Sequence, residues 1–326
     1  MLNYLQSIMS FGDREEDLFR LRQQHMGTMN KDKTIYFVNE DNKDVGFFAQ
    51  YRWWLEYLYF ADICGYTPVI RAGDHFVYRE RCEKGCINNA FEYYFGQPSG
   101  IGIREAYQSS NVVFSETKHR KMVEFIILGK YSCYYYNKQY LRMMARVARK
   151  YLKFNDMTKK YVYDGIKELG IGDGKTLGVH IRGTDFRKKY NDHPVFVTEE
   201  EAFFQIDILL SEHGYDKVFL ATDDNRILYN FQQRYKEKMC SYPHVLRSDN
   251  DQSVAFKKDN RKYNQYMLGL EVIRDMYTLS VCEGFVCGMS QVSVCAQINK
   301  LARGERYQNF VMIDKGVYKN SRLFHR

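Results

Sequence analysis

Three polar side chains crowd around a glycine at the end of an apolar run, and together they could bind an anion. Residues 177–181, with His180 among them, are apolar enough to predict a buried strand, and Arg182, Gly183 and Asp185 follow. A guanidinium can clamp a diphosphate through two parallel hydrogen bonds, and a glycine lets a ligand approach the backbone. The stretch therefore suits phosphate binding, although an Arg–Asp surface pair at a strand end would give the same pattern.

The elements around this stretch predict a doubly wound parallel sheet, because strands and helices alternate through the second half of the chain. Further strands are expected at 217–222, near 245–246, at 284–287 and at 310–313. Helices are predicted over 199–213 behind a capping box at Thr198, through 227–235, over about 264–279 and from 290 to 302.

Polar residues at three of these strand ends should meet at one edge of the sheet, where ligands bind in open α/β sheets. They are residues 182–185, then Asp223 and Asp224, then Ser290 and Gln291 at the start of a helix. A helix N-terminus favours phosphate, and either aspartate could accept hydrogen bonds from a ribose or a base. Ser290 and the aspartates could equally be ordinary helix N-caps.

A fourth candidate, Asp275, lies among Ile273, Met276 and Leu279 on a helix that otherwise reads as buried. A buried carboxylate needs hydrogen-bond donors. The adjacent N–H and amino groups of a guanine edge would supply them, and so would a nearby arginine.

The first half of the chain predicts a second α/β unit. A strand over 34–38, a helix over 47–64 ended by Gly65 and a strand over 67–70 form a right-handed βαβ unit. A helix over 2–24, a short strand over 111–114 and two helices within 137–169, broken near 155–156, are also expected, whereas residues 71–110 give no firm assignment. The turn-rich residues 171–174 indicate the domain boundary, so we expect one domain over 1–172 and a second over 173–326.

Net charge, cysteine spacing and hydropathy argue against several classes of protein. The 326 residues carry a net charge of +8, which favours an anionic ligand, but the basic residues form no block of the kind that binds nucleic acid. Cys82 and Cys86 lack a second cysteine pair, so no zinc site is expected. Residues 1–20 are too polar for a signal peptide and no apolar run reaches membrane-spanning length, so we expect a cytoplasmic protein with reduced thiols.

Taken together, these stretches resemble the catalytic domain of α1,6-fucosyltransferases, the group that contains the rhizobial nodulation and the core N-glycan enzymes. The order and spacing of the pieces match over roughly residues 176–305, and five concordant pieces are more specific than any one. They are LGVHIRGTD at 177–185, VFLATDD at 218–224, SDN at 248–250, the helix bearing Asp275, and FVCGMSQV at 285–292.

The resemblance implies a GT-B architecture, in which two Rossmann-like domains face a cleft. It implies GDP-fucose as the donor substrate, no metal ion or other cofactor, inversion at the anomeric carbon and an acceptor glycan as the second substrate. By position, His180 and Asp275 look like guanosine contacts, and Arg182, Gly183, Ser290 and Gln291 look like the diphosphate site. Asp185, Asp223 and Asp224 look like structural or donor-binding carboxylates of the same pocket. Contact with a membrane is expected only at its surface, and only for a lipid-linked acceptor.

The sequence also departs from the family pattern. A second basic residue and a lysine are common where this chain has Gly183 and Phe186. The carboxylate proposed as general base in the core-fucosylating enzymes falls by spacing on Tyr190, and an unperturbed tyrosine is a poor base at neutral pH. Asp192, His193 or a residue of the first domain would have to serve. Two alternatives therefore stay open: a transferase of another GDP-sugar, and a protein that binds a nucleotide sugar or glycan without catalysis.

Overall fold

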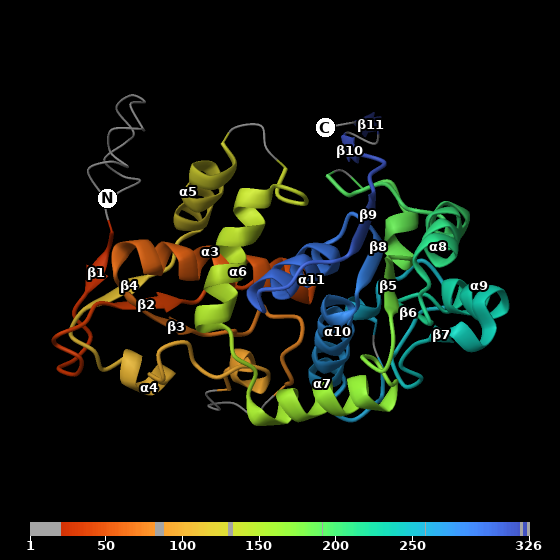
Figure 1. The fold of residues 1–326 in the computed structure, drawn as a ribbon. Helices are drawn as coiled ribbons and strands as arrows, with labels where there is room; N and C mark the ends of the chain where they lie inside the picture. Colours follow the sequence, from red (N-terminus) through yellow and green to blue (C-terminus); the bar gives the residue numbers. More distant parts are fainter. Residues whose placement is uncertain are drawn as a thin grey trace.

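Two sheets organise the residues that the computed structural model describes, which are 21–81, 88–129, 133–190, 192–257, 259–319 and 322–324. Figure 1 shows the sheet of the first half beside the sheet of the second half, with α6 and α11 between them. Most of the helix predicted over 2–24 and the pair Cys82 and Cys86 lie outside the described residues. The end of that predicted helix is wrong, because Gln23–Gln24 forms the edge strand β1.

The first sheet contains the predicted βαβ unit. Its strand order is β1-β4-β2-β3, in which β2 (Ile35–Val38) pairs in parallel with β3 (Thr67–Ile70) and β4 (Val112–Phe114), while β1 is antiparallel. The connecting helix α3 (Phe47–Cys64) ends at Gly65, whose φ of 69° is left-handed and favours glycine. The predicted strands, helix and stop are confirmed.

Further helices surround this sheet. The stretch 71–110, which had no firm prediction, contains the short helices η1 (Ala90–Tyr93) and α4 (Ile103–Ala106). Helix α5 (Thr117–Leu128) follows β4. The predicted break near 155–156 is confirmed, because α6 (Lys138–Tyr151) ends before it and Asn155 caps the start of α7 (Asp156–Glu168).

The second sheet is fully parallel, as predicted, with the order β7-β6-β5-β8-β9. Its strands are β5 (Thr176–Ile181), β6 (Lys217–Thr222), β7 (Met239–Cys240), β8 (Gly284–Gly288) and β9 (Asn309–Ile313). The chain order reverses direction between β5 and β8. Ligands bind at such a switch point, outside the carboxyl ends of the strands.

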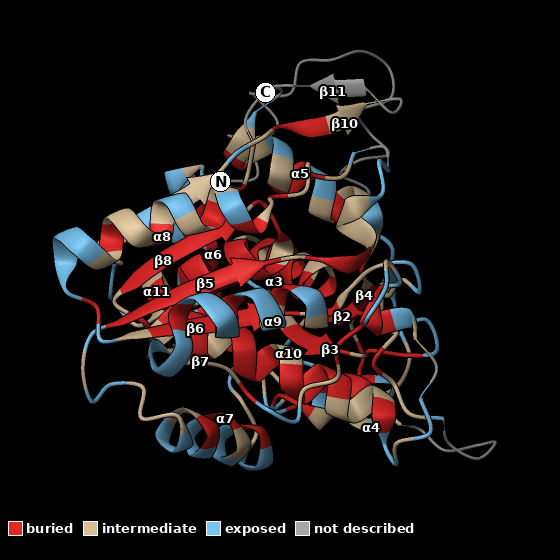
Figure 2. Ribbon diagram, turned by 90° about the vertical axis from the view of Figure 1, so that its right-hand side faces the viewer, coloured by how far each residue is buried: buried red, intermediate tan, exposed pale blue. Residues whose placement is uncertain are grey.

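Helices cover both faces of this sheet, and Figure 2 shows the strands buried while the outer faces of α8 and α9 remain exposed. They are α8 (Glu199–His213), α9 (Asn225–Tyr235), α10 (Asn264–Val281) and α11 (Gln291–Ala302). Short pieces connect them: η2 (Thr184–Arg187), η3 (Lys236–Lys238), η4 (Val254–Phe256) and the hairpin of β10 (Val317–Lys319) and β11 (Arg322–Phe324). The Thr198–Glu201 capping box predicted for α8 is confirmed.

One predicted strand is misplaced. Residues 245–246 form no strand, and the edge strand β7 lies earlier, at Met239–Cys240. Val245 and Leu246 line a cavity, so their side chains are apolar because they form its wall and not because they belong to a buried strand.

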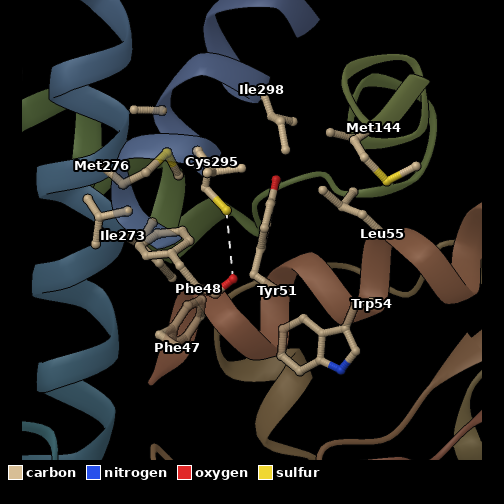
Figure 3. Packing of buried hydrophobic residues seen from close by; sticks show 14 of the residues in the cluster. Phe47, Phe48, Tyr51, Trp54, Leu55, Met144, Ile273, Met276, Cys295 and Ile298 are labelled. Carbon is tan, nitrogen blue, oxygen red and sulfur yellow. Dashed lines mark hydrogen bonds between the residues drawn. The ribbon is translucent and has the colours of Figure 1, made fainter. Parts of the chain in front are cut away.

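One hydrophobic core spans both halves of the chain. Helix α11 packs against α6, α3 and α10, and Figure 3 shows Phe48 and Tyr51 of α3 facing Cys295 and Ile298 of α11. The Cys295 thiol donates to the carbonyl of Phe48 at 3.7 Å. Among the described helices, none is long and apolar enough to cross a membrane.

Candidate active site

The loop after β5 is fastened to the end of β6 by a glycine. The Gly183 N–H donates to Asp223 Oδ1 at 2.9 Å, and the Thr184 hydroxyl donates to Asp223 Oδ2 at 2.7 Å. A Cβ on Gly183 would lie only 2.4 Å from the Cβ of the fully buried Asp224. Only glycine fits there, because it lets the two loops approach closely; the predicted approach of a ligand to this glycine stays a prediction.

Arg182 is held between two carboxylates. Its Nη2 donates to Asp185 Oδ1 at 2.9 Å and to Ser253 Oγ at 3.0 Å, and its Nη1 lies 3.2 Å from Asp223 Oδ2. Its Nε–H is buried and finds no hydrogen-bond partner among the described residues. Burial raises the pKa of Asp185, but the charge of Arg182 and the hydrogen bonds from Thr184 and Arg182 together outweigh burial, and the net pKa is lowered. The guanidinium is thus fixed in orientation, while its side chain remains 27% exposed at the cavity that it lines.

A cavity with about 600 Å³ of empty space, part of it open to solvent, lies at the predicted edge of the second sheet. Four of the predicted residues line it: His180, Arg182, Asp223 and Asp275. The remaining wall is largely apolar and comes from the ends of β6, the loop before α10, and α10 and α11: Ala221, Val245, Leu246, Val254, Ala255, Leu268, Val272 and Val292. An apolar slot with a few convergent polar groups is the usual form of a small-molecule site.

His180 and Ser290 connect β5 to the start of α11. The Ser290 hydroxyl lies 3.2 Å from His180 Nδ1 and also caps the helix by accepting from the Ser293 N–H. The Ser293 hydroxyl, which donates to the Gly288 carbonyl, lies 3.3 Å from the same Nδ1, so two serines hold the ring in place. Burial and the neighbouring Arg182 lower the pKa of His180 to about 3, so the ring is neutral at physiological pH.

Asp275 is a buried carboxylate without a direct partner. It is 8% exposed, and no hydrogen bond or ion pair to it is found within the described part of the chain. Burial raises the pKa of Asp275 to about 7, against the opposing charges of Arg247 and Arg274. Arg247 instead donates to backbone carbonyls, including that of Thr222 at 3.2 Å. The carboxylate is therefore free to accept hydrogen bonds from a ligand.

The other predicted residues, among them Gly183, Asp185 and Ser290, are not in the cavity lining, and the side chains of Asp224 and Gln291 have other partners. Asp224 caps α9 through the Arg226 N–H and pairs with the Arg226 guanidinium, so the N-cap interpretation describes its contacts. The Gln291 side chain faces the first half of the chain, where it accepts from Arg52 Nε at 3.2 Å and donates to the Tyr134 hydroxyl at 2.7 Å.

The candidate bases occupy different surroundings. Asp192, in a left-handed conformation with φ of 62°, is exposed and forms an ion pair with Lys319. Tyr190 is 46% exposed. His193 lies closer to the charged loop: its Nδ1 is buried without a hydrogen-bond partner among the described residues, and Asp185 and Arg182 act on it electrostatically.

Sequence reasoning missed three residues of the cavity region. Tyr78 comes from the first half of the chain and lies near Arg182, Asp223 and Asp185. Burial raises the pKa of Tyr78; the charge of Arg182 lowers it, and the two carboxylates raise it. Ser253 bonds Arg182, and Arg247 lies behind Asp275. Arg247 had a sequence signal, a charge directly after an apolar pair, whereas Tyr78 and Ser253 lie in stretches without regular structure and had none.

Metal ligands are not clustered in the described ranges: no group of three or more histidine, cysteine, aspartate or glutamate side chains there could hold an ion.

Comparisons with known proteins agree with this geometry. A structure of NodZ alpha-1,6-fucosyltransferase soaked with GDP-fucose is 15% identical over 82% of this chain and 92% of its own, with a TM-score of 0.50, which shows a shared GT-B-like fold. NodZ from Bradyrhizobium (14% identity, 81% and 93% coverage, TM-score 0.47) and POFUT1 in complex with GDP-fucose (13%, 87% and 98%, 0.46) also match. Comparison with curated protein sequences gives no match.

The profile of the alpha-(1,6)-fucosyltransferase N- and catalytic domains matches residues 135–318, more than half of the chain and all of the cavity except Tyr78. On this match, the chain belongs to the alpha-(1,6)-fucosyltransferase family.

Proposed function

We propose that this protein transfers fucose from GDP-fucose to a hydroxyl of an acceptor glycan, with inversion and without a metal ion. The observation that carries the proposal is the convergence of Arg182, His180 and Asp275 on one cavity at the switch point of a parallel sheet. The similar NodZ structure that was soaked with GDP-fucose supports the choice of donor.

The cavity offers complementary groups for each part of GDP. The apolar wall suits the flat base, and the Asp275 carboxylate can accept the N–H and amino donors of the guanine edge. The diphosphate would meet the exposed part of the Arg182 guanidinium and the backbone N–H groups of Gln291 and Val292, which have no helical acceptor because they lie in the first turn of α11. Asp223 would then keep Arg182 in place, and we propose no ligand contact for the side chains of Asp224 or Gln291.

In the reaction, the acceptor oxygen forms a bond to the anomeric carbon while the bond to the GDP oxygen breaks, and the hydroxyl proton goes to a base. Arg182 stabilises the negative charge that develops on the leaving diphosphate, which is how positioned donors accelerate such reactions. For the base we favour His193 over Asp192. Burial lowers the pKa of His193, so its ring is neutral and can accept a proton, whereas Asp192 is engaged with Lys319.

Donor competition tests the proposal. Isothermal titration with GDP-fucose, GDP-mannose, GDP and UDP should show tight binding of the guanine nucleotides and a preference for the fucosyl form, and the chain should then transfer fucose in the presence of EDTA. Equal affinity for all GDP-sugars would favour a different donor. Binding without transfer or hydrolysis across a broad panel of glycan acceptors would instead favour a non-catalytic binding protein.

We further propose a cytoplasmic location and an arrangement of separate acceptor-side (1–172) and donor-side (173–326) domains. Six cysteines of the described residues are free thiols, which is typical of a reducing compartment. Fractionation of cells that express the tagged protein would test the location.

A further inference from the structure

A second cavity lies away from the donor site, between the two halves of the chain. It has about 720 Å³ of empty space, part of it open to solvent, and is bounded by α6, by the last turns of α11 and by the segment that leads into β9. Lys300 of α11 lines it, and Gln291 at the donor end of the same helix is nine residues away, or about 14 Å along the axis. The two cavities share no lining residue.

The lining of this second cavity is strongly cationic. Lys138, Arg142, Lys300 and Arg306 contribute to it, and no aspartate or glutamate is among its described lining residues. Lys300 is neutralised by Glu305 and by carbonyls at the end of α10. The other three side chains are exposed and form no ion pair or hydrogen bond with any described residue. Unpaired cations of one sign around a concavity raise the local concentration of anions.

An aromatic surface lies beside these cations. The rings of Tyr307 and Phe310 stack with centroids 5.8 Å apart and planes inclined by 21°, and Phe310 is 38% exposed. Leu141 and Leu301 complete an apolar floor. Aromatic faces pack well against sugar rings, while guanidinium groups bind phosphate and sulfate through parallel hydrogen bonds.

From these contacts we propose that the cavity of Lys138, Arg142 and Arg306 binds an anionic saccharide, a ring compound that carries phosphate or sulfate esters. The ester oxygens pair with the three unpartnered cations and the ring lies on Phe310. The proposal does not depend on the donor assignment, because its residues are separate from the GDP cavity.

Titration of the full chain with two polyanionic rings tests the site: sucrose octasulfate for sulfate esters and phytate for phosphate esters. Sucrose and inositol serve as uncharged controls, and excess GDP is present throughout to occupy the donor cavity. We expect saturable binding of at least one polyanion, weakened about tenfold by Arg142→Gln or Arg306→Gln because each removes charge-assisted hydrogen bonds. The stronger ligand identifies the ester.

Matched variants separate a built site from general attraction to a basic protein. Arg104→Gln removes an equally exposed arginine from α4 that has no partner among the described residues, and should leave binding unchanged. Phe310→Leu keeps an apolar side chain on β9 and should weaken binding without changing its salt dependence. Absence of saturable binding, or equal loss in Arg104→Gln and Arg142→Gln, would overturn the proposal. GDP binding, measured in each variant, reports separately on the donor cavity.

Discussion

Arg182 Nη1 lies 3.2 Å from Asp223 Oδ2, and this contact joins the ends of β5 and β6 across the mouth of the donor cavity. The carboxylate does more than neutralise a charge, because it also accepts from the Gly183 N–H and the Thr184 hydroxyl. One aspartate thereby fixes the loop and orients the guanidinium. A fixed cation stabilises developing charge without reorganising during the reaction.

Arg182→Lys keeps the charge and loses the planar fork. We expect fucosyl transfer to fall by roughly 10²–10³-fold, since that is the usual effect of removing one positioned donor from a developing charge. Steady-state kinetics with GDP-fucose measure the loss, and circular dichroism checks the fold. Arg234→Lys on α9, which alters an exposed ion pair with Asp207 of α8, is the control. Near-normal turnover in Arg182→Lys would contradict the assigned role.

GDP affinity should fall as the solution becomes more acidic. The pKa of Asp275 is about 7 in the free protein, and only the ionised carboxylate can accept both donors of the guanine edge. Calorimetry between about pH 8 and pH 6 should therefore show weaker binding at the lower value. The terminal phosphate of GDP titrates in the same pH range. The Asp275→Asn variant is therefore the reference, because its pH dependence should come from that phosphate alone. Identical pH profiles for both proteins would refute the guanine contact.

The same carboxylate should lower stability at alkaline pH. Its pKa is raised from about 3.9 in the unfolded chain to about 7 in the folded protein, so the folded state holds an extra proton between these values and stability falls as pH rises through that window. Asp275→Asn removes the free-energy cost of ionising a buried carboxylate. We expect its melting temperature to exceed that of the wild type at pH values above about 7 and to approach it near pH 4. Thermal melts at both extremes measure the difference, and a constant offset would contradict the expectation.

Gly183→Ala should disrupt the donor loop through steric overlap. The new Cβ would lie 2.4 Å from the Cβ of Asp224, which is fully buried and cannot swing away. We expect destabilisation of roughly 1–3 kcal/mol, the usual cost of overpacking, together with weaker GDP binding. Gly96→Ala is the control, because nothing lies within 4 Å of its added Cβ. Denaturant unfolding and calorimetry compare the two, and equal stability of both variants would count against this packing.

The sequence predicted the second sheet well because its signals are local. Apolar runs at β5, β6 and β8, the capping box at Thr198 and the polar residues that follow each strand all fall within a few positions of one another. Parallel strands then bring those polar ends to one edge without further information. This explains why His180, Arg182 and Asp223 were found, whereas Asp275 was found because it is a carboxylate on an otherwise apolar helix; all four line one cavity.

Long-range contacts explain what sequence reasoning missed. Tyr78 reaches the donor cavity from a stretch without regular periodicity, and Gln291 turns toward Arg52, which is 239 positions away in the chain. Neither contact can be predicted from the types or spacing of the neighbouring residues in the sequence. The two-residue strand β7 is also too short to produce an alternating pattern.

The shared hydrophobic core has a thermodynamic consequence. Side chains of α3 and α6 in the first half and of α10 and α11 in the second belong to one buried cluster. Melting either sheet alone would expose the apolar surface of the other to water. The two halves should accordingly unfold in a single cooperative step, and calorimetric and van't Hoff enthalpies should coincide. A destabilising change beside the cavity of the second sheet would then lower the melting point of the first sheet by the same amount.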